Sequence, residues 1–128
     1  MKILVTGANG LLGRRLIEKL RDSHAVHAIV RATPEDAVEG VEYHIIDFGC
    51  EWGCSVLPQD INIIFHFVQS ENFRNFPDKA LDIFKVNVDS TARLLDYAQK
   101  TGIKRFVYAS SGGIYGSGSQ AFHENSPI

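Results

Sequence analysis

The segment Lys2–Leu20, with the sequence KILVTGANGLLGRRLIEKL, constrains the fold of this chain more than any other. It begins with the apolar run Ile3–Val5, which is typical of a buried parallel strand. A turn with three glycines follows (Gly7, Gly10, Gly13), and apolar residues then recur at the spacing of a helix (Leu12, Leu16, Ile17, Leu20). The segment therefore predicts a strand, a tight turn and a helix.

The three glycines have separate physical roles in such a turn. Gly7 lets the chain reverse, Gly10 lets the backbone approach a phosphate group, and Gly13 lets the helix pack closely on its strand. The free amides of the first helical turn, together with the positive end of the helix dipole, form a site for a pyrophosphate. The pattern predicts nucleotide binding, and the alternative is a strand-to-helix turn that binds no ligand.

The composition is that of one soluble domain, with 128 residues of which 45% are hydrophobic and 22% are charged. A formal net charge of -2 provides no basic surface for nucleic acid, so small-molecule partners are favoured. No apolar run approaches the length of a membrane span, and the N-terminal run is too short for a signal peptide. We therefore expect no nucleic acid or membrane partner, and a cytoplasmic location.

The two cysteines, Cys50 and Cys54, lie in a segment that also contains glycines. Two thiols complete neither a disulfide framework nor a zinc site, and His44 is the nearest candidate for a third ligand. We expect reduced loop thiols and no metal site.

The rest of the chain continues to alternate strand-like and helix-like segments. Short apolar or alternating runs predict strands at Ala25–Val30, Val41–Ile46, Ile61–Val68 and Lys104–Ala109. Phe48–Asp60 is expected to be a loop with at most one helical turn, and Ile114–Ile128 to be irregular.

One long amphipathic helix is predicted from about Asp78 to Thr101, where apolar residues recur every three or four positions (Leu81, Phe84, Val88, Ala92, Leu95, Ala98). Pro77 suits its first turn and Gly102 its C-terminal cap. Parallel strands joined by helices cross over right-handedly, so the predicted fold is α/β, a doubly wound parallel sheet with strand order 3-2-1-4-5 in one three-layer domain. Ligands then bind at the carboxyl ends of the first and fourth strands.

Two strand ends carry residues that would recognise the nucleotide. Arg31 follows the second strand, where an arginine pairs with the 2′-phosphate of NADP and an acid would bind the ribose hydroxyls of NAD. Arg31 therefore favours NADP, although Glu35 and Asp36 are close enough to act as the acid and a solvated arginine is the alternative. Asp47 and Phe48 follow the third strand and would contact the adenine, unless Asp47 only stabilises a turn.

Five motifs occur in order along the chain, and each lies at a predicted strand end or helix. They are TGANGLLG at Thr6–Gly13, Asp47 after the third strand, HF at His66–Phe67, NVDSTARLL at Asn87–Leu95 and RFVYASSGGIYG at Arg105–Gly116. Together they resemble the extended short-chain dehydrogenase/reductase family, the NAD-dependent epimerase/dehydratase proteins. The resemblance runs from Met1 to about Pro127 and is more specific than the glycine turn alone.

The resemblance implies a Rossmann domain over residues 1–128 that binds NADP or NAD, with hydride transfer at a hydroxyl of a sugar, commonly a nucleotide sugar. It implies that Ser111, beside Ser110, hydrogen-bonds the reacting hydroxyl and that Asn87 lies near the catalytic centre. The alternatives are a hydroxyl-rich strand exit and a solvated helix residue. The other residues expected along the cofactor are Thr6, Gly7, Asn9, Gly10, Leu11, Leu12, Gly13, Phe67, Val68 and Gln69.

The chain departs from the family pattern in two places. Val68 and Gln69 stand where the family usually has small residues beside the cofactor, and their side chains would crowd its nicotinamide end. The general acid/base of the family is a tyrosine with a lysine four residues later, which lowers the pKa of the phenol. None of the four tyrosines here has that partner, because residues 47, 101, 112 and 119 are Asp, Thr, Gly and Ser.

The family's tyrosine follows a segment like HENSPI, which is where this sequence stops, at Ile128. We therefore expect the N-terminal part of an epimerase, dehydratase or reductase, without its substrate domain and inactive by itself. The alternative is a non-catalytic dinucleotide-binding sensor or interaction module. A homodimer is possible in either case, because the edge of the fifth strand is expected to be open.

Overall fold

A computed structural model of the protein describes residues 1–116 and 121–126. Its sheet has five strands: β1 (Lys2–Thr6), β2 (Ala25–Val30), β3 (Val41–Ile45), β4 (Ile63–His66) and β5 (Arg105–Tyr108). Their order is β3-β2-β1-β4-β5, and every neighbouring pair is parallel. The predicted α/β class and the doubly wound strand order 3-2-1-4-5 are therefore confirmed.

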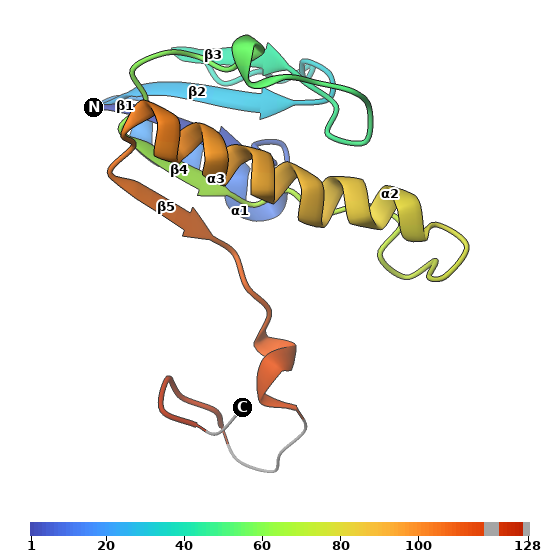
Figure 1. Ribbon diagram of the computed structural model, residues 1–128. Coiled ribbons are helices and arrows are strands. Elements are labelled where there is room, and N and C mark those ends of the chain that lie inside the picture. The colour runs from blue at the N-terminus through green and yellow to red at the C-terminus, as the bar shows by residue number, and fades with distance from the viewer. Residues whose placement is uncertain (117–120, 127–128) are drawn as a thin grey trace.

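Helices cover both faces of the sheet (Figure 1). Helix α1 (Leu11–Leu20) packs on one face and α3 (Ser90–Thr101) on the other. A short helix α2 (Ala80–Phe84) and a π-helical turn η2 (Lys85–Asp89) lead directly into α3. The described residues also form two 3-10 turns, η1 (Cys54–Val56) and η3 (Gly112–Tyr115).

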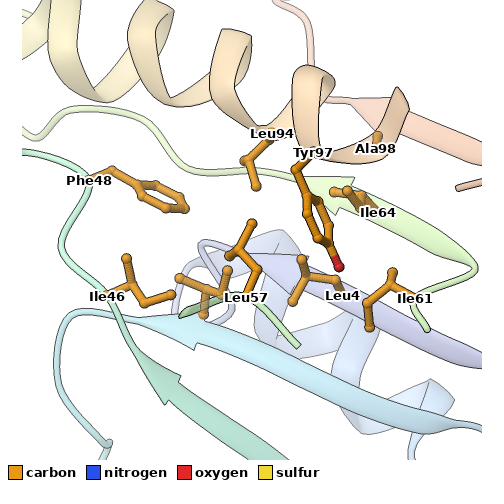
Figure 2. Packing of buried hydrophobic residues seen from close by; sticks show 10 residues of the cluster. Leu4, Ile46, Phe48, Leu57, Ile61, Ile64, Leu94, Tyr97 and Ala98 are labelled. Atoms are coloured by element: carbon orange, nitrogen blue, oxygen red, sulfur yellow. The ribbon is translucent and has the colours of Figure 1, made fainter. Parts of the chain in front are cut away.

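The core has two parts because successive side chains of a buried strand point to opposite faces. On β1, Leu4 packs on the α3 side, where Figure 2 shows it among residues of β4, α3 and the segment after β3. Ile3 and Val5 pack on the other side with Ile17 of α1. Burial of these side chains on both faces explains why β1 reads as a continuous apolar run.

Most predicted boundaries lie close to those of the structure. The second strand matches β2, whereas β3 ends one residue earlier than predicted and β5 is shorter by one residue at each end. The fourth predicted strand, Ile61–Val68, is too long by two residues at each end of β4. The loop Phe48–Asp60 contains the one turn expected, η1. The turn η3 overlaps the start of the segment predicted to be irregular, Ile114–Ile128, of which residues 117–120 and 127–128 lie outside the described residues.

The prediction for the long helix is wrong in its regularity and in its buried face. Helical structure begins at Ala80, and η2 adds a wider turn within it. Four of the six predicted apolar positions, Leu81, Phe84, Val88 and Leu95, are 48–69% exposed. The predicted Ala98 is buried, and the rest of the buried face is formed by Val86, Ser90, Leu94 and Tyr97. Gly102 does cap the helix, with φ of 70° in the left-handed region.

Within residues 1–116 and 121–126, no helix has both the length and the apolar character needed to cross a membrane.

Candidate functional site

A cleft of about 980 Å³ opens at the carboxyl ends of the central strands. Its walls come from the glycine turn after β1 and from the segments that follow β2, β3 and β4. Asp82 of α2 and Val86 of η2 close one side. The cleft lies where the strand order reverses, between β1 and β4, which is the place where open α/β sheets bind ligands.

Two glycines of the turn are required by close backbone packing. Gly7 has φ of 67°, and a Cβ there would lie 2.8 Å from the carbonyl carbon of Phe67. A Cβ on Gly13 would lie 2.3 Å from the carbonyl oxygen of Gly7. Both distances are too short for real contacts, so these glycines hold α1 against β1 and β4. Their predicted roles in chain reversal and helix packing agree with this geometry.

Gly10 has a different environment and lines the cleft. It is the N-cap residue of α1, its amide donates to the Gly7 carbonyl at 2.9 Å, and a Cβ there would meet only that same oxygen, at 3.2 Å. In the described part of the chain, no side chain caps this helix, and its first turn holds no acidic residue. The free amides of this turn, with the positive end of the helix dipole, therefore remain available to an anion.

Charge in the cleft is mainly negative. Among the described lining residues, three are acidic (Asp47, Glu71, Asp82) and one, Arg31, is a cation. Arg31 donates a hydrogen bond to the Glu71 carboxylate, which raises the pKa of the guanidinium and lowers the pKa of Glu71. Arg31 is therefore already paired across the cleft, between the segments that follow β2 and β4.

The segment after β4 is held by a hydrogen-bond network that no sequence motif indicates. The Ser70 hydroxyl and the Asn72 amide both donate to the Asp82 carboxylate, the latter at 3.0 Å. Both hydrogen bonds lower the pKa of Asp82, and the bond from Ser70 has the larger effect. They therefore favour the charged carboxylate. The backbone amide of Ser70 donates to Asn87 Oδ1 at 2.8 Å. Asn87, which was predicted to lie near a catalytic centre, thus positions this segment. In the sequence, the run of polar residues 69–72 was the available sign of this network.

Three further predicted residues of the cleft make contacts within the protein. Asp47 Oδ1 accepts a hydrogen bond from the Gly49 amide at 2.8 Å, so this carboxylate stabilises a turn while it also faces the cleft. Phe48 is buried, with its ring centroid 4.8 Å from that of Trp52. Asn9 Nδ2 donates to the Ala32 carbonyl at 3.3 Å and ties the glycine turn to the segment after β2. The adenine contacts of Asp47 and Phe48 stay predictions.

The structure gathers nine of the predicted site residues around the cleft: Gly7, Asn9, Gly10, Arg31, Asp47, Phe48, Phe67, Val68 and Gln69. Six others are not among the described lining residues. Thr6 is buried against His66, Gly13 is buried in the helix contact, and Leu11 and Leu12 are exposed at the start of α1. Asn87 acts through Ser70, as described above.

Ser111 is the sixth of these residues. The segment after β5 leads away from the sheet (Figure 1), and the exposed Ser111 accepts a hydrogen bond from the Gly113 amide at 3.1 Å. Its hydroxyl caps the turn η3. The role of Ser111 beside a reacting hydroxyl therefore stays a prediction.

Comparison with protein families gives a match over nearly the whole chain. The model of the NAD dependent epimerase/dehydratase family matches residues 3–128. UDP-glucose 4-epimerase of Mycolicibacterium smegmatis is 29% identical in an alignment that covers 91% of this chain and 41% of that protein.

Two solved structures have the same fold. A short-chain dehydrogenase/reductase superfamily protein from Agrobacterium tumefaciens with bound NAD is 30% identical with a TM-score of 0.80, covering 99% of this chain and 38% of that one. MoeE5 in complex with UDP-glucose and NAD is 27% identical with a TM-score of 0.77, covering 98% of this chain and 41% of that one. The chain thus spans about two fifths of the length of these relatives.

Proposed function

The chain belongs to the NAD-dependent epimerase/dehydratase family, and from this premise we propose that it is the NAD(P)-binding portion of an enzyme that transfers hydride at a hydroxyl of a nucleotide sugar. One observation carries the proposal: the N-terminus of α1, with no side-chain cap among the described residues, opens into a cleft at the reversal of strand order. The similar structures with bound NAD and UDP-glucose support the choice of ligands.

The residues of the cleft fit a dinucleotide. A volume of about 980 Å³ lies at the upper end of the roughly 300–1,000 Å³ range of ligand sites. The amides of the first turn of α1 would bind the pyrophosphate, and Gly10 would let it approach the backbone. Asp47 would accept a hydrogen bond from the adenine amino group. When bound, the nicotinamide would supply or accept the hydride, and Ser111 would hydrogen-bond the reacting sugar hydroxyl.

The pairing of Arg31 with Glu71 supports NAD over NADP, although Arg31 alone favours NADP. A 2′-phosphate would have to displace the Glu71 carboxylate from Arg31. It would also lie in the field of Asp47 and Asp82, both of which are close enough to raise the pKa of Arg31. Repulsion from these carboxylates would weaken the binding of NADP, which carries the 2′-phosphate, and not that of NAD.

The alternative function is a non-catalytic dinucleotide-binding module. Val68 and Gln69 line the cleft where the family usually has small residues, and this observation favours the alternative. On either proposal, this chain alone binds the cofactor and does not turn over a sugar.

Calorimetric titration of the purified chain with NADH, NADPH and ADP tests the proposal. We expect NADH to bind more tightly than NADPH, and ADP to bind more weakly than NADH. NADPH binding tighter than NADH would keep the nucleotide site and reject the argument from Glu71. Absence of binding by all three ligands would overturn the proposed function. A Gln69→Ala variant with higher affinity for NADH would show that the Gln69 side chain crowds the cleft.

A further inference from the structure

Two histidines and a glutamate meet on one face of the sheet, away from the cleft. Strands β2 and β3 pair in parallel with His27 opposite Glu42, and His44 follows Glu42 by two residues. Residues two apart on a strand point to the same face, so all three side chains lie together. Figure 1 shows β3 at the edge of the sheet beside β2. None of the three residues is among those that line the cleft.

The distances among their donor atoms suit a small metal ion. His27 Nδ1 lies 3.0 Å from His44 Nε2 and 3.5 Å from Glu42 Oε2, and His44 Nε2 lies 3.5 Å from Glu42 Oε1. Ligands at about 2.0–2.1 Å from a tetrahedral zinc ion are separated by roughly 3.3–3.4 Å. The two imidazole nitrogens and the two carboxylate oxygens of Glu42 therefore lie at separations close to those between the ligands of a zinc ion.

The facing atoms of this group carry more lone pairs than protons. Two neutral imidazoles share a single proton between the facing nitrogens of His27 and His44, so one of these nitrogens presents only a lone pair. The Glu42 carboxylate, which carries further lone pairs, lies 3.5 Å from both nitrogens. A divalent cation at the centre would accept electron pairs from all three side chains at once.

The three side chains differ in how deeply they are buried. The His27 side chain is 10% exposed and that of His44 is 19% exposed, whereas Glu42 is 65% exposed. The imidazoles are thus held by the sheet, and the carboxylate side is open to water as a source of the fourth ligand. Burial also lowers the pKa of His27, which favours the neutral imidazole that binds metals.

We propose that His27, Glu42 and His44 form a binding site for a divalent transition metal of the zinc type, which cross-links the edge strand β3 to β2. Two imidazole nitrogens and one carboxylate oxygen are a ligand set that zinc uses, with a water in the open position. The sequence suggests His44 only as a partner of the two cysteines, because the register of β2 with β3 cannot be read from it.

Metal titration of the whole chain, after treatment with a chelator, tests this site without any cofactor. We expect one Zn²⁺ to bind per chain by calorimetry and to raise the melting temperature. Co²⁺ should give the visible absorption of a tetrahedral site without thiolate charge-transfer bands. His44→Ala and Glu42→Gln should each lower the affinity by at least the roughly tenfold that loss of an outer-shell partner costs.

Matched variants separate this site from other metal-binding groups. His123→Ala removes an exposed histidine elsewhere and should leave Zn²⁺ affinity unchanged. A Cys50→Ser, Cys54→Ser double variant should also bind normally. Circular dichroism identifies any variant that fails to fold, and His44→Gln then replaces His44→Ala. Zn²⁺ binding that persists in folded His44 and Glu42 variants, or that is lost in the cysteine variant, would overturn the proposal, as would no binding by the wild-type chain.

Discussion

Thr6 Oγ1 lies 2.6 Å from Nδ1 of His66, so the carboxyl ends of the two central strands are joined by a buried hydrogen bond. The other ring nitrogen lies 2.9 Å from Thr91 Oγ1, and the Thr91 hydroxyl already donates to the Asn87 carbonyl. His66 must therefore donate from Nε2 and accept at Nδ1 from Thr6. A second proton at Nδ1 would replace the proton that Thr6 donates, so this hydrogen bond is made with the neutral imidazole.

The first prediction concerns the pH dependence of stability. Burial lowers the pKa of His66 to about 4 in the folded chain, from an ordinary value of 6.5. Between these values the unfolded chain binds a proton at His66 that the folded chain does not, so the free energy of unfolding falls as the pH decreases. The full contribution, on the order of 3 kcal/mol, is present above about pH 6.5 and is lost towards pH 4.

Urea unfolding between about pH 7.5 and pH 4.5 measures this contribution. Other groups also titrate in this range, so the comparison is with His66→Gln, which should show a shallower dependence on pH. His123→Gln, at an exposed position, should keep the wild-type dependence. An equal pH dependence in wild type and His66→Gln would contradict the prediction.

Gly10→Val should abolish binding of NADH while the chain remains folded. The added methyl groups would occupy the space through which a pyrophosphate approaches the amides of α1, whereas the nearest protein atom to the new Cβ is the Gly7 carbonyl oxygen at 3.2 Å. Loss of a favourable N-cap residue should cost about 1 kcal/mol of stability. Calorimetry with NADH and urea unfolding measure the two effects. Gly53→Ala, outside the cleft, is the control, and unchanged NADH affinity in folded Gly10→Val would refute the site.

Gly13→Ala should destabilise the fold, although alanine is the better helix former by about 1 kcal/mol. The new Cβ would lie 2.3 Å from the Gly7 carbonyl oxygen and 2.7 Å from the Ala8 Cα, and neither backbone atom can move without shifting β1 or α1. Overpacking of this kind costs about 1–3 kcal/mol. The sign of the change in the free energy of unfolding tests this prediction. A stabilised Gly13→Ala variant would mean that α1 does not pack this closely on the turn after β1.

Glu71→Gln should shift cofactor preference towards NADPH. The substitution keeps the shape of the side chain but removes the charge that pairs Arg31, and so frees the guanidinium for a 2′-phosphate. The ratio of NADPH to NADH affinity, measured by calorimetry, should rise several-fold. Glu39→Gln removes an exposed carboxylate outside the cleft and should leave the ratio unchanged. A ratio that stays the same in Glu71→Gln would show that Glu71 does not oppose the phosphate.

The fold was predictable because local patterns report it directly. Continuous apolar runs marked β1 and β2, and the rule for right-handed crossovers then allowed few arrangements of five parallel strands. The glycine turn was also visible, since Gly7 and Gly13 are required by contacts between segments adjacent in sequence or in the sheet. The pairing of Arg31 with Glu71 was not visible, because it joins residues that only the completed sheet brings together.

The buried face of the long helix shows a second limit of sequence patterns. Apolar spacing identified a helix, but Phe84 and Leu95 point outward whereas Ser90 is buried, with its hydroxyl bonded to the Val86 carbonyl. A hydroxyl that is satisfied by its own helix can be buried at little cost, and hydropathy does not register this. The π-helical turn η2 also changes the phase between the two halves of the helix.

Strand β1 precedes the other strands of the sheet along the chain, yet it lies at the centre of the sheet between β2 and β4. Ile3 pairs on one side with Val26, which follows after a short helix, and on the other side with Ile63. The β1–α1–β2 unit can therefore assemble early during synthesis, but one edge of β1 stays unpaired until β4 has emerged. Sheet contacts of such long sequence separation form slowly and leave the nascent chain open to aggregation. The rate of synthesis between β2 and β4 thus sets how long the open edge of β1 must be protected.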